Sequence, residues 1–179
     1  GTVFSLPQRV DFIADSVSRF PTVSTDENGN PIIAFMKFNS TFGDARYVVT
    51  RSNDYGLTFG PDVPASYVGG ANVCDCCPAS LVHSGNTSAL LFRNNNNDLR
   101  TIWTALSNDN GETYSTGAEV DPTGWMISAC PSSGPDGVII GDTLYSVFMS
   151  GTFGTRCYIT STCLSTLAPG PDRELTPNL

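Results

Sequence analysis

The sequence predicts an all-β fold: a β-propeller of four-stranded antiparallel blades, with about three blades present. Its apolar runs are short and rich in Val, Ile, Phe and Tyr, as half-buried strands require. Seventeen Gly and twelve Pro indicate many turns. A turn-like octet also recurs at the spacing of a propeller blade.

Two octets carry the repeat. Residues 52–59 read SNDYGLTF and residues 107–114 read SNDNGETY, so the second begins 55 positions after the first. The shared Asp can accept backbone N–H groups across a tight turn, and the shared Gly supplies a position with positive φ. We therefore interpret the octets as structural clasps of hairpins. The residues that we expect to form them are Ser52, Asp54, Gly56, Thr58, Ser107, Asp109, Gly111 and Thr113.

β-rich runs surround each octet and divide the chain into units. A third unit opens at Pro131, but residues 161–164 stand where its octet should be, so this octet is degenerate. Four short strands in a unit of about 40–50 residues are typical of a propeller blade. The alternative is a β-sandwich with two similar hairpins. The expected divisions are an outer strand of a preceding blade at 1–15, and blades at 16–72, 73–126 and 127–179.

Charge and cysteine content restrict the classes of function. Seventeen acidic residues against nine basic ones give a net charge of −8, which argues against nucleic acid as a partner. No apolar run is long enough for membrane insertion. Six cysteines favour an oxidising compartment, so we expect a secreted or periplasmic protein. Asn39 and Asn86 each begin a sequon that could accept a glycan.

The octets resemble the Asp boxes, or bacterial neuraminidase repeats, of the sialidase superfamily. Its members are six-bladed propellers, so the resemblance implies that the three blades are half of a six-bladed propeller. Sialidases use three arginines, an Asp acid/base and a Tyr nucleophile assisted by a Glu. The resemblance implies that Arg19, in Arg-Phe-Pro at residues 19–21, is the first arginine and that Asp44 is the acid/base. Alternatively, Arg19 is a solvated residue at a strand edge. A Tyr/Glu pair cannot be assigned within three blades, so we expect an incomplete active site.

A second resemblance is to secreted sialidase-like proteins of unassigned activity. It rests on CDCCPAS at residues 74–80 and GWMISACP at residues 124–131. This likeness implies a fold and a location more than an activity.

The cysteines leave two interpretations open. Cys74, Cys76 and Cys77 cluster where the second unit begins, and Cys130 has the same repeat position as Cys77. We expect these four to lie close together and to form disulfides, with a thiolate site for copper or zinc as the alternative. Cys157 and Cys163 remain as a third pair. We expect no metal and no cofactor.

Arg93, Asn95 and Trp125 are the candidate ligand-binding residues. Asn95 belongs to a run of four Asn at 94–97, which is either a simple polar loop or a rim that bonds sugar hydroxyls. Trp125 could stack on a sugar ring or belong to the core.

The expected function is that of a secreted, sialidase-like extracellular module that binds glycan or protein or has a structural role. The alternative is an exo-sialidase-like glycoside hydrolase completed by further blades or a second chain. Because three blades cannot close a ring, we expect self-association or further blades as partners, besides a glycan or extracellular protein ligand.

Overall fold

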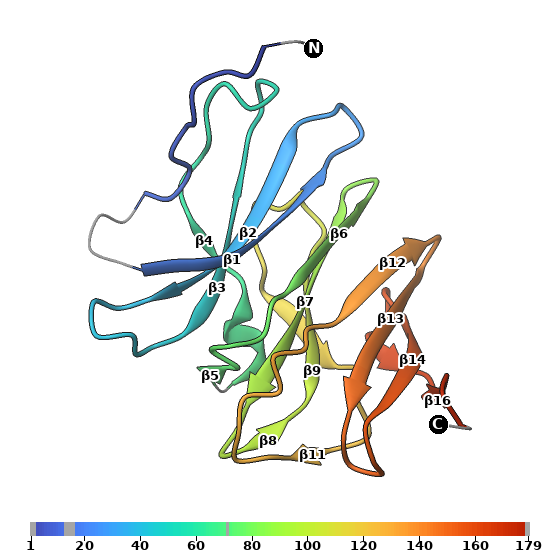
Figure 1. Cartoon of the computed structure of the whole chain (residues 1–179). Helices are drawn as coiled ribbons and strands as arrows, with labels where there is room; N and C mark the ends of the chain where they lie inside the picture. The colour runs from blue at the N-terminus through green and yellow to red at the C-terminus, as the bar shows by residue number, and fades with distance from the viewer. Residues whose placement is uncertain (1–2, 13–16, 71, 178–179) are drawn as a thin grey trace.

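The computed structural model describes residues 3–12, 17–70 and 72–177, which form three consecutive antiparallel β-sheets of four or five strands and one two-stranded sheet (Figure 1). The only helix in these ranges is the short 3-10 turn η1 (Ser66–Gly69). None of the described helical structure is long and apolar enough to cross a membrane. The prediction of an all-β, partial propeller built from four-stranded blades is therefore confirmed.

Each sheet runs through its strands in chain order, as a propeller blade does. The first holds β1 (Val17–Thr25), β2 (Pro31–Phe38), β3 (Arg46–Arg51) and β4 (Val63–Pro64). The second holds β6 (Ser80–Ser84), β7 (Thr87–Asn95), β9 (Ile102–Ser107) and β10 (Thr116–Glu119). The third holds β12 (Asp136–Ile140), β13 (Thr143–Ser150), β14 (Arg156–Cys163) and β15 (Ala168–Pro169).

Four shorter strands complete the pairing. β5 (Asn72–Val73) adds to β7, and β16 (Arg173–Glu174) adds to β14. β8 (Leu99–Arg100) pairs with β11 (Trp125–Met126), at the lower end of the view in Figure 1. The β8–β11 pair joins the second blade to the connection that leads to the third.

The core lies between the blades. Leu90 and Phe92 of β7 belong to a cluster shared with the first blade, whereas Ala89 and Leu91 belong to a cluster shared with the third. Successive side chains of a strand point to opposite faces, so β7 is buried on both of them. This position explains why its sequence is continuously apolar from Ala89 to Phe92.

The two octets form the same turn. In the first, the Ser52 hydroxyl donates to Asp54 Oδ1 at 2.7 Å and accepts the Gly56 N–H at 2.8 Å. The backbone N–H of Thr58 donates to Asp54 Oδ1 at 2.8 Å, and its hydroxyl donates to Oδ2 at 2.6 Å. Ser107, Asp109, Gly111 and Thr113 repeat all four bonds at 2.6–2.9 Å. Gly56 has φ of 86° and Gly111 of 84°, which favours glycine there.

The third blade fastens the equivalent turn with a residue from another turn. Asp142, between β12 and β13, accepts the Ser165 N–H at Oδ1 (3.0 Å) and the Ser165 hydroxyl at Oδ2 (2.6 Å). Its backbone oxygen accepts the Leu164 N–H at 2.9 Å. The sequence pattern missed this arrangement because the carboxylate lies more than 20 positions before the turn that it stabilises.

The expected outer strand at 1–15 does not form in its described part. Residues 3–12 form no strand, and residues 1–2 and 13–15 lie outside the described residues. Segment 3–12 follows the edge of the first blade, where the Gln8 side chain donates to the Leu57 carbonyl oxygen at 3.1 Å and the Phe12 N–H donates to Asp62 at 3.4 Å. A fourth strand pairs with the third strand of its own blade, and this segment has no such partner among the described residues.

Candidate functional site

The blades present two different ends. The octets lie at one end with the β1–β2 turn, and the Tyr55 N–H donates to Asn30 Oδ1 at 3.0 Å between them. The β2–β3 loop (39–45), the β7–β8 turn (96–98) and the β13–β14 loop (151–155) lie at the other end. All five residues that the sequence nominated for ligand binding or catalysis fall on or near this second end.

A cavity of about 500 Å³ opens at the second end between the first and second blades. Most of its lining is polar, and Tyr67 in η1 is 59% exposed there. Amide, carboxylate, guanidinium and phenol groups therefore border one space. The lining residues are Asp44, Ala45, Arg46, Ser66, Tyr67, Gly70, Asn72, Asn95, Asn96 and Asn97.

The asparagine run forms a two-residue hairpin turn as well as part of the cavity wall. Asn97 and Asp98 have φ of 51° and 69°, which is the conformation of a type I′ turn, and Asn96 and Leu99 exchange two backbone hydrogen bonds. Asn95 Oδ1 accepts the Asp98 N–H at 3.1 Å, which leaves its amide nitrogen for other partners. The run is therefore a polar hairpin turn that borders the cavity, and its bonding to sugar hydroxyls stays a prediction.

Asp44 lines the large cavity and a second, smaller cavity of about 160 Å³ beside it. The β2–β3 loop that carries it is shaped by Asn39, whose Oδ1 accepts the N–H groups of Thr41 (3.0 Å) and Gly43 (2.8 Å). The Asp44 carboxylate forms an ion pair with Arg46. Asp75 also lines the smaller cavity, so two carboxylates border it.

Arg19 is placed near Asp44 but lines neither cavity. Its guanidinium lies over the rings of Phe38 and Phe42, at 5.6 Å and 5.1 Å from their centroids. Phe42 in turn lines the smaller cavity with Asp44. The side chain of Arg19 is exposed, as in the alternative reading of a solvated edge residue.

The placement of Arg93 corrects the expectation of a ligand-binding role. It is 1% exposed, and its guanidinium donates to the carbonyl oxygens of Ser133 (3.0 Å), Arg100 (3.3 Å) and Met149 (2.7 Å). These bonds join three separate segments of the second and third blades. Arg93 therefore acts as an internal cross-link, and a ligand cannot reach it.

Trp125 is likewise packed into the protein. The Arg93 guanidinium lies 5.4 Å from its ring centroid. A Cβ added to Gly151 would come within 2.6 Å of the indole, so the ring lies directly on the backbone of the β13–β14 loop. Of the two readings open for Trp125, the geometry favours packing over sugar stacking.

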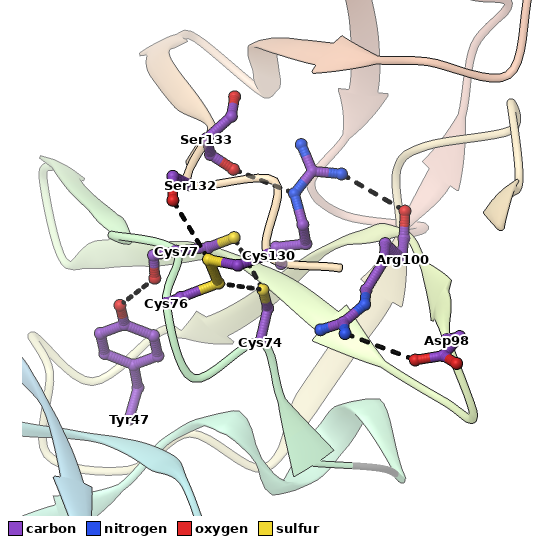
Figure 2. The surroundings of a disulfide bond; sticks show 10 residues. Tyr47, Cys74, Cys76, Cys77, Asp98, Arg100, Cys130, Ser132 and Ser133 are labelled. Carbon is purple, nitrogen blue, oxygen red and sulfur yellow. Dashed lines mark hydrogen bonds and ion pairs between the residues drawn. A yellow bond between two sulfur atoms is a disulfide. The ribbon is translucent and has the colours of Figure 1, made fainter. Parts of the chain in front are cut away.

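The four cysteines around the opening of the second blade do gather (Figure 2). Cys76 and Cys130 form a disulfide that joins positions 54 apart. Cys74 and Cys77 are free and buried, so the expectation that they form disulfides is wrong. Their Sγ atoms lie 2.7 Å apart, and Cys74 Sγ lies 3.6 Å from Cys76 Sγ. The Tyr47 hydroxyl donates to the Cys77 carbonyl oxygen at 2.8 Å, which ties the cluster to the first blade.

The hydrogen bond between the two thiols moves the pKa values of Cys74 and Cys77 in opposite directions. The hydrogen bond from the Cys77 thiol lowers the pKa of Cys74, and the nearby cations of Arg100 and Arg93 lower it further. The same shared proton raises the pKa of Cys77, as does its burial.

The third expected pair, Cys157 with Cys163, is wrong. Both residues lie on β14, six positions apart, which is about 20 Å along a strand. Cysteines in a disulfide have Cα atoms about 4.4–6.8 Å apart, so these two cannot bond to each other. Both are free.

The two sequons lie at opposite ends of the blades. Asn39 is exposed in the β2–β3 loop beside the cavities, and Asn86 is exposed in the β6–β7 turn near the octets. Their glycosylation stays a prediction.

No protein-family model matches the sequence, and no curated protein matches it. Solved structures match the fold. An α-L-arabinanase of Penicillium chrysogenum aligns with a TM-score of 0.67 over 92% of this chain at 16% identity. A family 117 glycoside hydrolase of Zobellia galactanivorans gives 0.61 over 96% at 12% identity, and the endosialidase of phage phi92 gives 0.57 over 91% at 15% identity.

This chain spans only part of those enzymes, covering 50%, 60% and 27% of their lengths. At such low identities the likeness establishes the fold alone. The neighbours are propeller glycoside hydrolases, so the chain has the fold of a propeller glycosidase.

Proposed function

We propose that the chain is a carbohydrate-binding propeller module of sialidase-like type, and that it binds a glycan in the cavity between its first two blades. The observation that carries the proposal is the group of four asparagines, Asn72 and Asn95–Asn97, bordering one cavity of about 500 Å³ with Tyr67. Its volume lies within the range of about 300–1,000 Å³ that is usual for small-ligand sites.

The chemistry of these groups suits a sugar. An amide offers two donors and an acceptor, so it can bond two neighbouring hydroxyl groups of a sugar ring. Tyr67, 59% exposed, offers an apolar ring face for the C–H groups of the same ring. The Asp44–Arg46 pair adds a charged acceptor and a charged donor at the cavity wall.

We further propose that the protein works outside the cytoplasm. The Cys76–Cys130 disulfide supports this proposal, since disulfides persist in oxidising compartments. Propeller glycoside hydrolases among the structural neighbours are compatible with it.

The test is a binding measurement with oligosaccharides. Arabinobiose, β-1,3-galactotriose and sialosides form a suitable panel, because these sugars or their cleavage are named for structural neighbours. We expect Asn95→Ala and Tyr67→Ala each to weaken binding by about tenfold or more, or about 1.4 kcal/mol. The matched controls are Asn28→Ala and Tyr55→Ala, exposed residues at the octet end, which should bind normally. Binding that is equal in all four variants, or absent across the panel, contradicts the proposal.

A second candidate function is hydrolysis by a site that further blades or a second chain complete. It is favoured by Asp44 and Asp75, two carboxylates that border the smaller cavity, since most glycosidases use such a pair. Turnover of fluorogenic sialosides or arabinosides that disappears in Asp44→Asn would establish it. Turnover that survives this change, or that is never seen, leaves binding as the function.

A further inference from the structure

We propose that the large cavity and the smaller cavity beside it form one groove, which binds two neighbouring rings of an uncharged oligosaccharide. This inference rests on the proposed function, because it names the class of glycan that the same site takes. The two cavities share the lining residues Asp44, Ala45, Asn72 and Asn95. A ligand that contacts these shared residues therefore reaches both spaces.

The smaller cavity is an extension of the larger one. Its volume of about 160 Å³ lies below the range of about 300–1,000 Å³ that is usual for small-ligand sites, whereas the large cavity, with about 500 Å³, lies within that range. The smaller space is thus too small to serve as a ligand site by itself. Together the two spaces suit a short chain of rings better than a single ring.

One exposed aromatic side chain lines each cavity. Tyr67, in η1, is 59% exposed and lines only the large cavity. Phe42, in the β2–β3 loop, is 53% exposed and lines only the smaller one. The C–H groups of a sugar ring can pack on the apolar face of an aromatic ring. The groove therefore offers one such face to each of two successive sugar rings.

The backbone holds Phe42 in a conformation that a bulky residue rarely adopts. Its φ is 60°, in the left-handed region that favours glycine and asparagine. The Phe42 N–H donates to the Asn39 carbonyl oxygen at 3.0 Å, and the Arg19 guanidinium lies 5.1 Å from the ring centroid. A strained residue that is more than half exposed adds little to the core, and such residues cluster at ligand sites. Contact with a ligand gives this ring a role that core packing does not.

The charges of the lining favour an uncharged sugar. The charged residues that line either cavity are Asp44, Arg46 and Asp75. Asp44 forms an ion pair with Arg46, whereas Asp75 is exposed and has no ion pair in the described part of the chain. Arg19 lines neither cavity, and the whole chain has a net charge of −8. A carboxylated or sulfated sugar would meet an excess of like charge in this groove.

The experiment compares sugars of different length on the whole chain. Isothermal titration calorimetry with arabinose and arabinobiose, and with galactose and β-1,3-galactotriose, measures the gain from additional rings. We expect an oligosaccharide to bind at least about tenfold more tightly than its monosaccharide, because a second ring contacts Phe42. Sialyllactose, which carries a carboxylate, should bind more weakly than the neutral oligosaccharide.

Phe42→Asn separates binding from folding. Asparagine tolerates a φ of 60°, so the variant should be as stable as the parent. Loss of the ring should weaken oligosaccharide binding by about tenfold and leave monosaccharide binding unchanged. Phe42→Tyr keeps the ring and should bind as the parent does. The matched control is Phe153→Asn, at an exposed position of the β13–β14 loop that lines neither cavity.

Three results would overturn this inference and leave the proposed function unaffected. They are equal affinity for monosaccharide and oligosaccharide, oligosaccharide binding that Phe42→Asn does not change, and tighter binding of sialyllactose than of any neutral sugar. Saturation-transfer NMR on the parent should show both rings of arabinobiose in contact with the protein, which decides the matter even if a variant fails to fold. Absence of binding by every sugar contradicts the proposed function itself, and this inference with it.

Discussion

The guanidinium of Arg51, at the end of β3, donates a hydrogen bond from Nη1 to the carbonyl oxygen of Asn110, 2.9 Å away in the octet of the next blade. Nη1 also lies 3.3 Å from Glu112 Oε1 in the same octet. Each octet closes its own hairpin, and this contact adds a link between hairpins of neighbouring blades. The octet end of the protein is therefore a connected layer.

Arg51→Ala should destabilise the protein by about 1–3 kcal/mol, the usual worth of hydrogen bonds that involve a charged group. Its side chain is only 16% exposed, so water replaces the lost contacts poorly. Urea unfolding of the parent and the variant measures the change. Arg173→Ala, at an exposed position of β16, is the control, and equal losses in both variants would contradict the role of Arg51.

Ser107→Ala should lower the free energy of unfolding by about 1–3 kcal/mol, for a different reason. The buried Ser107 hydroxyl accepts the Gly111 N–H and donates to Asp109, so its removal leaves a backbone donor without a partner. Thermal unfolding with Ser128→Ala as an exposed control checks this prediction. A Ser107 variant as stable as the control would show that the octet does not fasten the hairpin.

The octet carboxylates should make stability depend on pH. Hydrogen bonds from the side chain and backbone of Thr58 and from Ser52 lower the pKa of Asp54 to about 2. Burial acts to raise the pKa of Asp109, but hydrogen bonds from Ser107 and Thr113 outweigh it and bring the value to about 2. Each carboxyl has a lower pKa in the folded protein than in the unfolded chain, where it is about 3.9. Its ionised form therefore stabilises the folded protein at pH values above about 3.9, and this stabilisation is lost as the pH falls toward 2.

Unfolding free energy should therefore fall between about pH 5 and pH 2, and less steeply in the double variant Asp54→Asn/Asp109→Asn. Thr58→Val and Thr113→Val should raise the two carboxyl pKa values, which NMR titration can follow. Identical pH slopes in the parent and the double variant would refute this assignment.

Lys37 and Asp62 form an ion pair whose side chains are 0% and 4% exposed. Removing one partner leaves the other charge buried, so Asp62→Ala should destabilise the protein by about 3–5 kcal/mol. The double change Lys37→Met/Asp62→Leu should be much less harmful, because it buries no charge. Chemical denaturation of the parent, the single variant and the double variant measures their free energies of unfolding. A double variant that is less stable than Asp62→Ala would contradict this prediction.

The outer face of the third blade should mediate self-association. Val138, Ile140, Tyr145 and Val147 are 38–63% exposed on β12 and β13, and Val138 lies opposite Tyr145 in the register. In the first two blades the corresponding face packs on the next blade. We expect two chains to pair into one ring, or longer arrays, at micromolar concentration.

Light scattering measures this association. Val138→Lys should shift the population toward monomer, and Leu57→Lys, at an exposed position of the first octet, should not. A monodisperse monomeric parent would show that the face has no partner in another copy.

The strands and their order were predictable because their signals are local. The continuously apolar run Ala89–Phe92 and the Asn-rich turn after it each reflect the conformation of a few neighbouring residues. Cys130 was expected near Cys74, Cys76 and Cys77 because it has the same repeat position as Cys77, and the four do lie together. Cys76 and Cys130 form a disulfide, whereas the disulfide expected for Cys74 and Cys77 does not form.

The wrong predictions for Arg93 and for the Cys157–Cys163 pair concern the three-dimensional positions of side chains, which the local sequence does not give. In the sequence, Arg93 lies at the end of an expected strand, where an exposed side chain is usual. The structure shows that its guanidinium bonds the carbonyl groups of residues 100, 133 and 149. Cys157 and Cys163 were paired because they remained after the other four cysteines, but both lie on β14, which keeps them apart.

Asp142 carries a wider consequence. The third blade keeps the carboxylate, the two N–H and O–H donors and the closed turn, yet takes the acid from a different hairpin. A turn of this kind can therefore be closed by a carboxylate from a neighbouring hairpin, without an octet in the sequence. A count of octets in a sequence of this type is thus a lower bound on its number of blades.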